Sequence, residues 1–372
     1  MDFQVCSPFR NAPSARFSGS TVSVNSSKAS NSSTQEKVAV IYQAIEPPII
    51  NGVRKPMKPG GYRDSGADIA YNLRTINSVE AVFPVSVPSP EKDSEWCFPD
   101  TEEGMLDAVK RGATHLWANT ILFASHPLQT STALGKLEDT LKVVGHGPLV
   151  VEKYDDKELV NKLLRRTGGF TMPRSWTIHH TPEFSATLRQ KTCHSPSLPS
   201  RSEDEEAMAH HVGRIPCRRR GHGHCDAPNG EKNKYWSLPI VTRFNHQDGI
   251  APYNGVVAVT ANSRVVTKEE EKDPAYEQIS RECEKVAEVL AVTAPIRIDV
   301  RRFDDSPGSK FALFDVNMKP NMTGPGRPGR DDQASLTLMA AEALGWDYPE
   351  LLRQILYTSS TLRALRELKP NE

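Results

Sequence analysis

The sequence lacks a long hydrophobic run, a net charge and a regular spacing of cysteine. No apolar stretch approaches the roughly 18 to 20 residues of a membrane-spanning helix, so we expect a soluble protein with no membrane partner. The 46 Lys and Arg residues balance 46 Asp and Glu residues, so no chain-wide basic field exists to hold a nucleic acid. The six cysteines are irregularly spaced, which argues against a disulfide framework and is typical of a reducing compartment.

The first 36 residues contain little that could form a core. They hold ten serines and few large apolar side chains, so we expect residues 1–36 to be a disordered tail. Arg10, Arg16 and Lys28 leave a cleavable organelle signal as an alternative, although the apolar core of a secretory signal is missing. We therefore favour a cytoplasmic protein.

Strands alternate with helices between residues 37 and 150. The β-branched run from Lys37 predicts a buried strand, and two further strands are predicted at 79–87 and 114–123. Helices are predicted between them, over 66–76 and 101–113. This alternation predicts an N-terminal α/β domain, residues 37–150, with a small parallel sheet covered by helices.

A second domain, residues 151–372, is predicted to begin after the Gly147-Pro148 turn. Residues 149–178 predict a strand, a helix, a Gly-Gly stop and another strand. Further predicted elements are a helix from Pro274 to Leu290, strands at 296–303 and 311–317, and a helical region from Ser335. Residues 191–234 show no apolar period, and we expect no packed element there.

Four polar residues lie on the two strands at 296–303 and 311–317. Strand alternation places Arg297 and Asp299 on one face of the first, and Asp315 and Asn317 on one face of the second. Two carboxylates and an amide oxygen suit Mg²⁺, which also contacts nucleotide phosphates, and Arg297 would face the same oxyanions. The alternative is a solvent-facing polar stripe in which Arg297 pairs with an acid.

These strands resemble the C-terminal half of ATP-grasp ligases, most of all the D-alanine:D-alanine ligase type. The family pattern is an arginine two residues before an acid, a turn, then acid-x-Asn-x-x-Pro and a Met-Thr pair. The matching residues here are Arg297, Asp299, Asp315, Asn317, Pro320, Met322 and Thr323. The segment from Ser335 and Leu336 resembles the closing helices of the family.

An upstream segment, residues 155–178, is similar to the DK-x-x-x-K-x-x-L-x-x-x-G-x-x-x-P stretch of the same family. Lys157 falls on the lysine that reaches ATP phosphates there. Taken alone, this segment also fits an ordinary helix start, with Asp155 and Asp156 favoured by the helix dipole.

The resemblance implies an ATP-grasp architecture, with an N-terminal parallel α/β domain and a C-terminal α+β nucleotide-binding domain. It also implies ATP-dependent joining of a carboxylate to an amine through an acyl phosphate. Asp299, Asp315 and Asn317 would bind Mg²⁺, with Mn²⁺ as an alternative, Lys157 would neutralise the β- and γ-phosphates, and Arg297 would be the catalytic residue. No protein nucleophile is then needed.

The substrates implied are small amino-acid-like molecules. The Ser-rich tail favours a eukaryotic source, and we expect amino-acid coupling in a fungal small-metabolite pathway rather than cell-wall synthesis. A homodimer is one option for the assembly.

The sequence departs from the family in two places. Asp315 stands where the family usually has Glu, and the lid motifs (a Val-x-Lys-Pro strand, a Gly/Ser-rich loop and Glu-Glu-x-x-x-Gly-x-Glu) are missing between Ile178 and Leu238. Back-translation of 210–228, started one base later, permits IMLEEFLAGDEVTVTVMP, which contains the last motif. We therefore hypothesise a frame shift within 191–234, with further residues missing near Gln190; a transcript that continues in the printed frame would contradict it. The alternative is a non-catalytic remnant that binds nucleotide or a partner.

Three weaker candidates remain. Cys217, His222, His224 and Cys225 supply zinc-type ligands, but their spacing is too tight for the usual knuckles, and the basic patch around them lacks aromatic residues for nucleic-acid binding. The polar loop with His246, Asp248, Tyr253 and Asn254 either borders the substrate site or is a plain loop. The GGYRDSG turn at 60–66 could receive a carboxylate or phosphate on backbone N–H groups.

Overall fold

The computed structural model describes residues 35–50, 53–54, 56–173, 207–213, 235–244, 259–303, 306 and 308–371. These ranges belong to one unit, which spans Gln35–Glu372. The predicted disordered tail lies outside them, apart from its last two residues.

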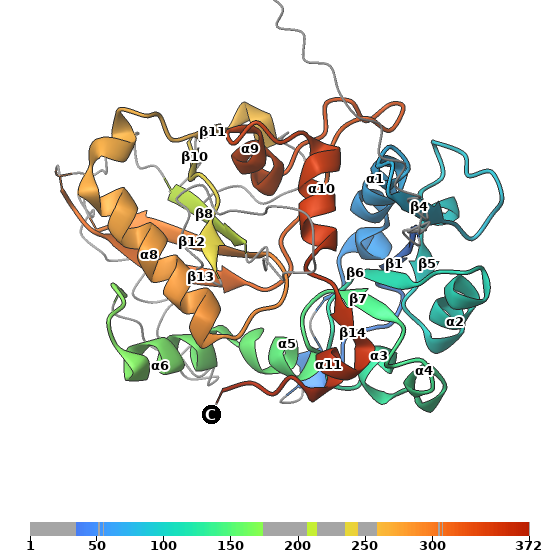
Figure 1. Ribbon diagram of the computed structural model, residues 1–372. Helices are drawn as coiled ribbons and strands as arrows, with labels where there is room; N and C mark the ends of the chain where they lie inside the picture. Colours follow the sequence, from blue (N-terminus) through green and yellow to red (C-terminus); the bar gives the residue numbers. More distant parts are fainter. Residues whose placement is uncertain are drawn as a thin grey trace, which may run out of the picture. The chain divides into compact units, whose positions relative to one another are not determined.

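The elements alternate between strand and helix through the first part of the chain (Figure 1). The helices of the described residues are α1 (Arg63–Leu73), α2 (Glu102–Lys110), α3 (Pro127–Thr130), α4 (Thr132–Gly135), α5 (Pro148–Tyr154), α6 (Lys157–Thr167), α8 (Pro274–Val289), α9 (Leu336–Glu342), α10 (Tyr348–Leu356) and α11 (Leu362–Glu367), with short 3₁₀ turns η1 (Pro59–Tyr62), η2 (Asp93–Glu95), η4 (Val259–Ala261) and η5 (Glu270–Lys272). The strands are β1 (Glu36–Tyr42), β2 (Ile49–Ile50), β3 (Val53–Arg54), β4 (Val79–Val82), β5 (Phe98–Pro99), β6 (His115–Asn119), β7 (Lys142–Val144), β8 (Ala207–Gly213), β9 (Trp236–Ser237), β10 (Val241–Arg243), β11 (Ser263–Val265), β12 (Ile296–Arg302), β13 (Phe311–Asn317) and β14 (Ser360–Thr361).

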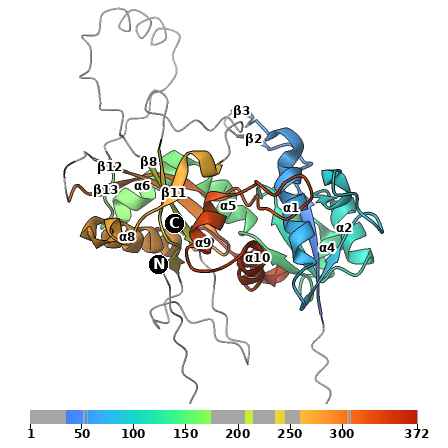
Figure 2. The same ribbon diagram turned by 90° about the horizontal axis from the view of Figure 1, so that it is seen from above.

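The first sheet has the order β14-β7-β6-β1-β4, with β5 paired to the end of β1. β1, β4, β5, β6 and β7 run parallel, as predicted, and β14 from the C-terminal part of the chain is antiparallel to β7. The small β2–β3 hairpin precedes α1 in the chain and is visible in Figure 2.

β1 is apolar and buried from Val38 to Ile41 because both faces of its sheet are covered. Val38 and Val40 pack in one cluster with α1 and α10, whereas Ala39 and Ile41 pack in another with α2 and α11. A strand that is buried on both faces loses the alternation of polar and apolar residues. The centre of this sheet is therefore buried on both of its faces.

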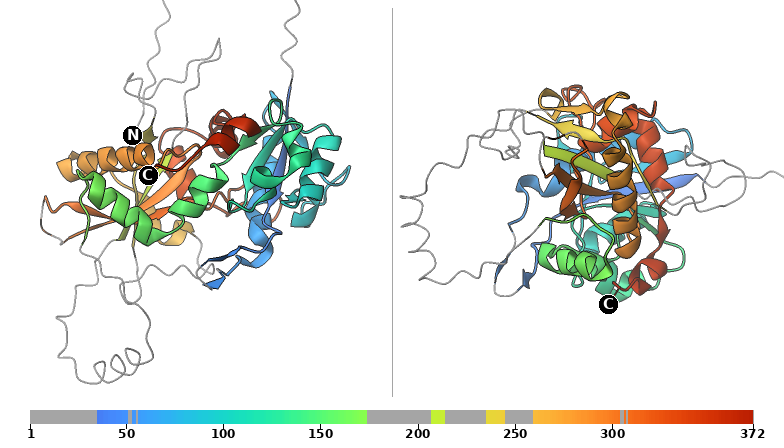
Figure 3. Two further views of the ribbon diagram at one scale, coloured as in Figure 1. Left: turned by 90° about the horizontal axis from the view of Figure 1, so that it is seen from below. Right: turned by 90° about the vertical axis from the view of Figure 1, so that its left-hand side faces the viewer.

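The second sheet is antiparallel, in the order β11-β10-β8-β12-β13, with β9 paired to β8. Buried residues of α5, α6 and α8 form its core together with the inward side chains of β12 and β13. Lys285 on α8 donates a hydrogen bond to the Gly168 carbonyl just beyond α6 at 3.0 Å, and the two helices lie near each other in Figure 3. This sheet and its helices position the polar strand pair described below.

Two predictions about this region were wrong. The apolar run after Gly147 is the helix α5, not a strand, because Pro148 occupies its first turn and Val150, Val151 and Tyr154 are buried on one side. Within 191–234, where no packed element was expected, the backbone of β8 pairs with both β10 and β12. The ladder needs a strand at that position because the facing edges of β10 and β12 would otherwise leave their backbone groups unpaired.

The C-terminal helices return to the first sheet. Leu351, Leu352 and Ile355 of α10 pack in the same cluster as β1 and α1. The division into domains at residues 150 and 151 remains a prediction. Within the described residues, no helix has the length and apolar character of a membrane span.

Candidate functional site

Strands β12 and β13 hold the polar residues that the sequence predicted to gather. Arg297 lies opposite Asn317 in the ladder, and Asp299 lies opposite Asp315. Along β12, buried positions alternate with half-buried ones from Ile296 to Val300, so Arg297 and Asp299 share the face turned away from the core. The structure thus brings the four residues together, while their roles remain predictions.

A β-bulge in β13 sets the direction of this polar face. The ladder passes from Leu313 directly to Asp315, so Phe314 is an extra residue, and its side chain is 65% exposed. Leu313 and Val316 both pack in the core, although strict alternation would place them on opposite faces. The bulge therefore lets Asp315 turn toward Asp299 while its neighbour Val316 stays in the core.

Each carboxylate is paired with a cation. Arg297 donates to Asp299 through Nε at 2.8 Å and through Nη2 at 3.1 Å. Lys157, the first residue of α6, donates from Nζ to Asp315 Oδ2 at 2.8 Å. The ion pair of Arg297 with an acid, which the sequence left as an alternative, is thus present on the same polar face. Lys157 and Asp315 thus meet although they lie 158 residues apart in the sequence.

Burial changes the pKa of Asp299. Loss of solvent raises the pKa of its carboxyl group, and the nearby Asp315 raises it further, whereas Arg297 and Arg243 lower it. Because like charges face each other across the ladder, the cations beside them stabilise the pair.

The donor set fits a hard cation. Asp315 Oδ1 is buried and has no hydrogen-bond partner among the described residues, which leaves one carboxylate oxygen open to a ligand. Asn317 Oδ1 accepts from the Lys319 backbone N–H at 2.9 Å and retains a second lone pair. Carboxylate and amide oxygens are the ligands that Mg²⁺ prefers. In the described part of the chain no group of three or more His, Cys, Asp and Glu side chains forms a metal cluster.

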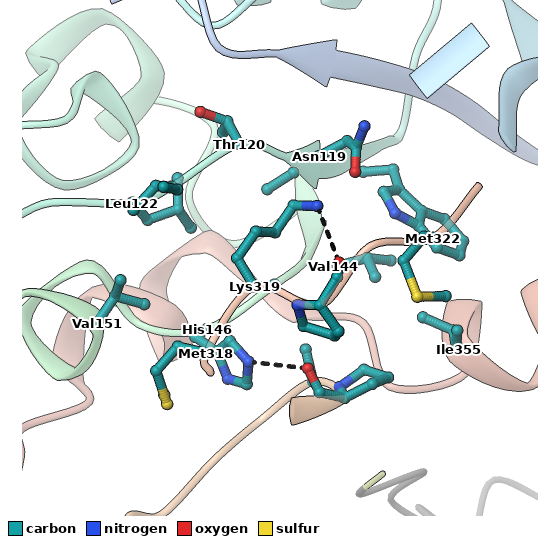
Figure 4. A pocket seen from close by; sticks show the side chains of 17 residues that line it. Asn119, Thr120, Leu122, Val144, His146, Val151, Met318, Lys319, Met322 and Ile355 are labelled. Carbon is teal, nitrogen blue, oxygen red and sulfur yellow. Dashed lines mark hydrogen bonds between the residues drawn. The ribbon is translucent and has the colours of Figure 1, made fainter. Parts of the chain in front are cut away.

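A cavity that the sequence did not predict opens beside this polar strand pair. About 50 Å³ is open to the centres of water molecules, which is room for about four waters. Its walls come from the ends of β6 and β7, from α5 and from the segment after β13 (Figure 4). The residues with polar side chains on its walls are Asn119, Thr120, His146 and Lys319.

Lys319 brings a cation into this cavity, two residues beyond Asn317. Its ammonium donates to the Pro320 carbonyl at 3.3 Å and lies 4.6 Å from the centre of the Tyr62 ring. Burial, together with the like charge of Lys58, lowers the pKa of Lys319 to about 7. Lys319 occupies an unspecified position of the family pattern acid-x-Asn-x-x-Pro, so the pattern did not predict a charged residue there.

The GGYRDSG turn lies next to Lys319 through Tyr62. Gly61 has a φ of +59°, and a Cβ there would lie 1.8 Å from the Gln43 carbonyl oxygen, so only glycine allows this close approach. Tyr62 itself has a left-handed φ of 64° and directly precedes α1. Its predicted contact with substrate remains a prediction.

Several predicted candidates lie outside the described residues. They are the zinc-type set Cys217, His222, His224 and Cys225, and the polar loop with His246, Asp248, Tyr253 and Asn254. Most of the segment 191–234 lies outside as well, so the frame-shift hypothesis is unchanged.

No protein-family model and no curated protein sequence matches this chain. Among solved structures, the chain is similar to D-alanine–D-alanine ligase from Bacillus anthracis, at 17% identity and a TM-score of 0.50, covering 89% of this chain and 99% of that one. Similarity extends to that enzyme complexed with ATP, at 16% identity, TM-score 0.48 and coverage of 90% and 99%. VanG D-Ala:D-Ser ligase from Enterococcus faecalis matches at 11% identity, TM-score 0.45 and coverage of 87% and 98%.

The similarity at a TM-score of 0.50 extends over nearly the whole of the Bacillus anthracis enzyme. The predicted fold class is thereby confirmed: this chain has the ATP-grasp fold of the D-alanine–D-alanine ligases.

Proposed function

We propose that this protein is an ATP-dependent ligase that joins the carboxylate of an amino-acid-like small molecule to an amine. The observation that carries the proposal is the convergence of Lys157, Arg297, Asp299 and Asp315 on one polar face of the second sheet. Phosphoryl transfer depends on positioning and charge stabilisation, which such a mixture of cations and carboxylates supplies. The shared fold with D-alanine–D-alanine ligases supports the same reaction class.

Asp299, Asp315 and Asn317 are the residues that would hold Mg²⁺, with Mn²⁺ as the alternative. When bound, the ion neutralises phosphate charge and orients the phosphate oxygens. Lys157 is 69% exposed and sits at the start of α6, so its ammonium can leave Asp315 for a phosphate oxygen.

In the proposed reaction, the substrate carboxylate attacks the γ-phosphorus of ATP, and ADP departs with the electrons of the broken P–O bond. The amine then attacks the carbonyl carbon of the acyl phosphate, loses a proton, and inorganic phosphate departs. Arg297 presents its guanidinium to the transferred phosphoryl group and to the tetrahedral oxyanion, a contribution typically worth about 10²- to 10³-fold in rate. The apolar cavity walls would keep water from the acyl phosphate.

The proposal extends to the setting of this reaction. We place the enzyme in the cytoplasm, in small-metabolite biosynthesis, with no nucleic-acid partner and with a homodimer as one option. The balanced charge supports the absence of a nucleic-acid partner, and the irregular cysteines support a reducing compartment.

The test is Mg-ATP binding by the full chain, followed by ADP release across a panel of amino acids. Lys157→Met should weaken ATP binding, whereas Lys162→Met, on the same helix and 66% exposed, should not. Nucleotide binding without amino-acid-dependent ADP release would favour the non-catalytic alternative. Absence of nucleotide binding would contradict the proposal.

A further inference from the structure

Glu282 is a buried carboxylate that the proposed reaction does not use. It lies on α8 and is 9% exposed. Its Oε2 accepts from the Thr171 backbone N–H at 2.6 Å, and its Oε1 accepts from the Thr171 hydroxyl at 2.8 Å and from Gln278 Nε2 at 2.9 Å. Burying a carboxylate is costly unless its hydrogen bonds are made. Most of these bonds go to one residue, so Glu282 fixes both the backbone and the side chain of Thr171.

One face of α8 contacts the chain that follows α6. Gln278, Glu282 and Lys285 are four and three residues apart, so they lie on the same side of the helix. In addition to the bonds of Glu282, the Lys285 ammonium donates to the Gly168 carbonyl at 3.0 Å. The chain that leaves α6 is thereby held along α8, and both helices contact β13 (Figure 1).

Thr171 is bonded in turn to the outer edge of β13. Its carbonyl accepts from the Leu313 backbone N–H at 2.8 Å. β13 is the last strand of the second sheet, so this edge has no neighbouring strand among the described residues. Leu313 directly precedes Phe314, the extra residue of the bulge, and Asp315 follows. The bond from Thr171 therefore fixes β13 immediately before the bulge that turns Asp315 toward Asp299.

Helix α6 and the chain beyond it are thus bonded to β13 at two points. Lys157, the first residue of the helix, donates to Asp315 Oδ2 at 2.8 Å. Four residues beyond its last residue, Thr171 accepts from Leu313. The two bonds lie on either side of Phe314. A shift of Thr171 away from α8 would therefore move both Asp315 and the lysine that pairs with it.

We infer that Glu282 is a positioning residue, which holds Asp315 in place through Thr171 and the edge of β13. This inference rests on the proposed function, because Asp315 is one of the residues that would hold Mg²⁺. Loss of Glu282 should then weaken Mg-ATP binding only while Asp315 keeps its carboxylate. A general loss of stability would weaken binding whether or not that carboxylate is present.

The test is a double-mutant cycle in the full chain, with Mg-ATP affinity measured by calorimetry. Glu282→Ala should weaken binding about 10-fold in the unmodified background and less than about 2-fold in the Asp315→Asn background. Residues in one hydrogen-bond network show such non-additivity, whereas the effects of independent sites add. Glu282→Gln keeps an acceptor for the Thr171 N–H and should retain most of the affinity.

Glu284→Ala is the matched control. Glu284 lies on the same helix and accepts from the Ser237 backbone N–H at 3.0 Å and from the Ser237 hydroxyl at 3.1 Å. It makes the same kind of contact as Glu282, but to β9, which pairs with β8. Its loss should lower stability in a similar way and change Mg-ATP affinity less than about 2-fold in both backgrounds.

Amide hydrogen exchange, measured by NMR, gives a second reading that needs no nucleotide. Because the Leu313 N–H donates to Thr171, its exchange should be at least about 10-fold faster in Glu282→Ala and unchanged in Glu284→Ala. If Glu282→Ala does not fold, Thr171→Val takes its place in both measurements. That variant removes only the hydroxyl that donates to Glu282, so it should show the same pattern with smaller changes.

The outcomes separate this inference from the ligase proposal. Equal weakening by Glu282→Ala in both backgrounds, or no weakening, would overturn the positioning role, and so would unchanged exchange of the Leu313 amide. If Asp315→Asn binds too weakly for the cycle, the exchange rates decide. If the unmodified chain binds no Mg-ATP, the ligase proposal falls, and faster exchange in Glu282→Ala but not in Glu284→Ala would still support the hold of Glu282 on β13.

Discussion

Asp299 and Asp315 face each other directly across two strands, an arrangement that is unfavourable without cations nearby. Arg297 and Lys157 provide those cations through short ion pairs. At the residue scale, the candidate site is therefore a pair of carboxylates whose repulsion is offset by side chains from two separate elements, and a divalent cation would offset the same repulsion.

Asp315→Asn tests this pair. Removing one charge and the free oxygen Oδ1 should weaken Mg-ATP binding by at least about 10- to 100-fold, as loss of a charged interaction does. Calorimetry with Mg-ATP, repeated in EDTA, measures it: chelation should reduce the affinity of the unmodified protein to that of the variant. Asp107→Asn, an exposed carboxylate paired with Arg111, is the matched control. Unchanged affinity in Asp315→Asn would remove the metal assignment.

Two buried histidines predict a pH dependence of stability. Burial lowers the pKa of both His115 and His146 to about 4. His146 Nδ1 accepts from the Thr293 backbone N–H at 3.2 Å, so protonation there would set two donors against each other. Because the unfolded chain takes up these protons near pH 6.5, the free energy of unfolding should fall as pH drops from 6.5 to about 4, by about 3 kcal/mol per histidine.

Urea unfolding at several pH values between 4 and 7 measures this dependence. His146→Gln, which can still donate and accept but does not titrate, should flatten the slope. An equally steep slope in the variant would show that His146 does not contribute.

At the scale of elements, helix α6 holds Lys157 through its own N-terminus. Asp156 is the N-cap, and its Oδ1 accepts from the backbone N–H groups of Glu158 at 2.8 Å and Leu159 at 3.2 Å. The sequence analysis gave an ordinary helix start as the alternative to a phosphate-binding lysine. In the structure, Lys157 is the first residue of this helix, so the capped helix start also positions the lysine.

Asp156→Ala should lower the free energy of unfolding by about 1 kcal/mol and weaken ATP binding, because the first turn frays and Lys157 loses its position. Asp156→Ser, a good N-cap, should restore most of both. Denaturant unfolding and calorimetry provide the two readings. If Asp156→Ala is measurably destabilised but binds ATP normally, the N-cap does not determine the position of Lys157.

Element prediction succeeded where local signals agree with tertiary burial. The helix predicted from Pro274 to Leu290 is α8, because Asp273 caps it and its apolar side chains recur on one face. Prediction failed for α5, where β-branched residues favoured a strand but the proline and the burial of one side decided for a helix. It failed for β8 because this strand is defined by its pairing with β10 and β12, and a local sequence pattern does not contain that pairing.

The features of the candidate site also divide into those that the sequence predicts and those that it does not. Arg297, Asp299, Asp315 and Asn317 could be predicted because two adjacent strands carry them at regular spacing. The cavity could not be predicted, because segments far apart in the sequence form its walls, and the bulge at Phe314 has no local signature in the chain.

At the scale of the whole molecule, a buried ion cluster ties the segment after β13 to α1. Arg327 is 2% exposed and Asp68 is fully buried, and Arg327 Nε donates to Asp68 Oδ1 at 2.9 Å. Arg330 donates to both oxygens of Asp68, at 2.7 and 2.9 Å. Burial raises the pKa of Asp68, and the two arginines counter this rise.

Arg327→Met should lower the free energy of unfolding by about 3 to 5 kcal/mol, because it removes one partner from a buried charge network. Arg111→Met, which breaks the exposed pair with Asp107, should cost less than about 1 kcal/mol. Thermal and urea unfolding compare them. Equal stability of the two variants would show that the buried cluster adds nothing to the link between these segments.

The most direct test of the proposed reaction follows an oxygen atom. If the carboxylate takes the γ-phosphoryl group, a substrate amino acid labelled with ¹⁸O in its carboxylate must leave one label in inorganic phosphate when the amine displaces it. We predict ¹⁸O-labelled phosphate, formed only with Mg-ATP and an accepted amino acid and absent in Arg297→Met. Amino-acid-dependent ADP release with unlabelled phosphate would contradict the acyl-phosphate mechanism and with it the central claim.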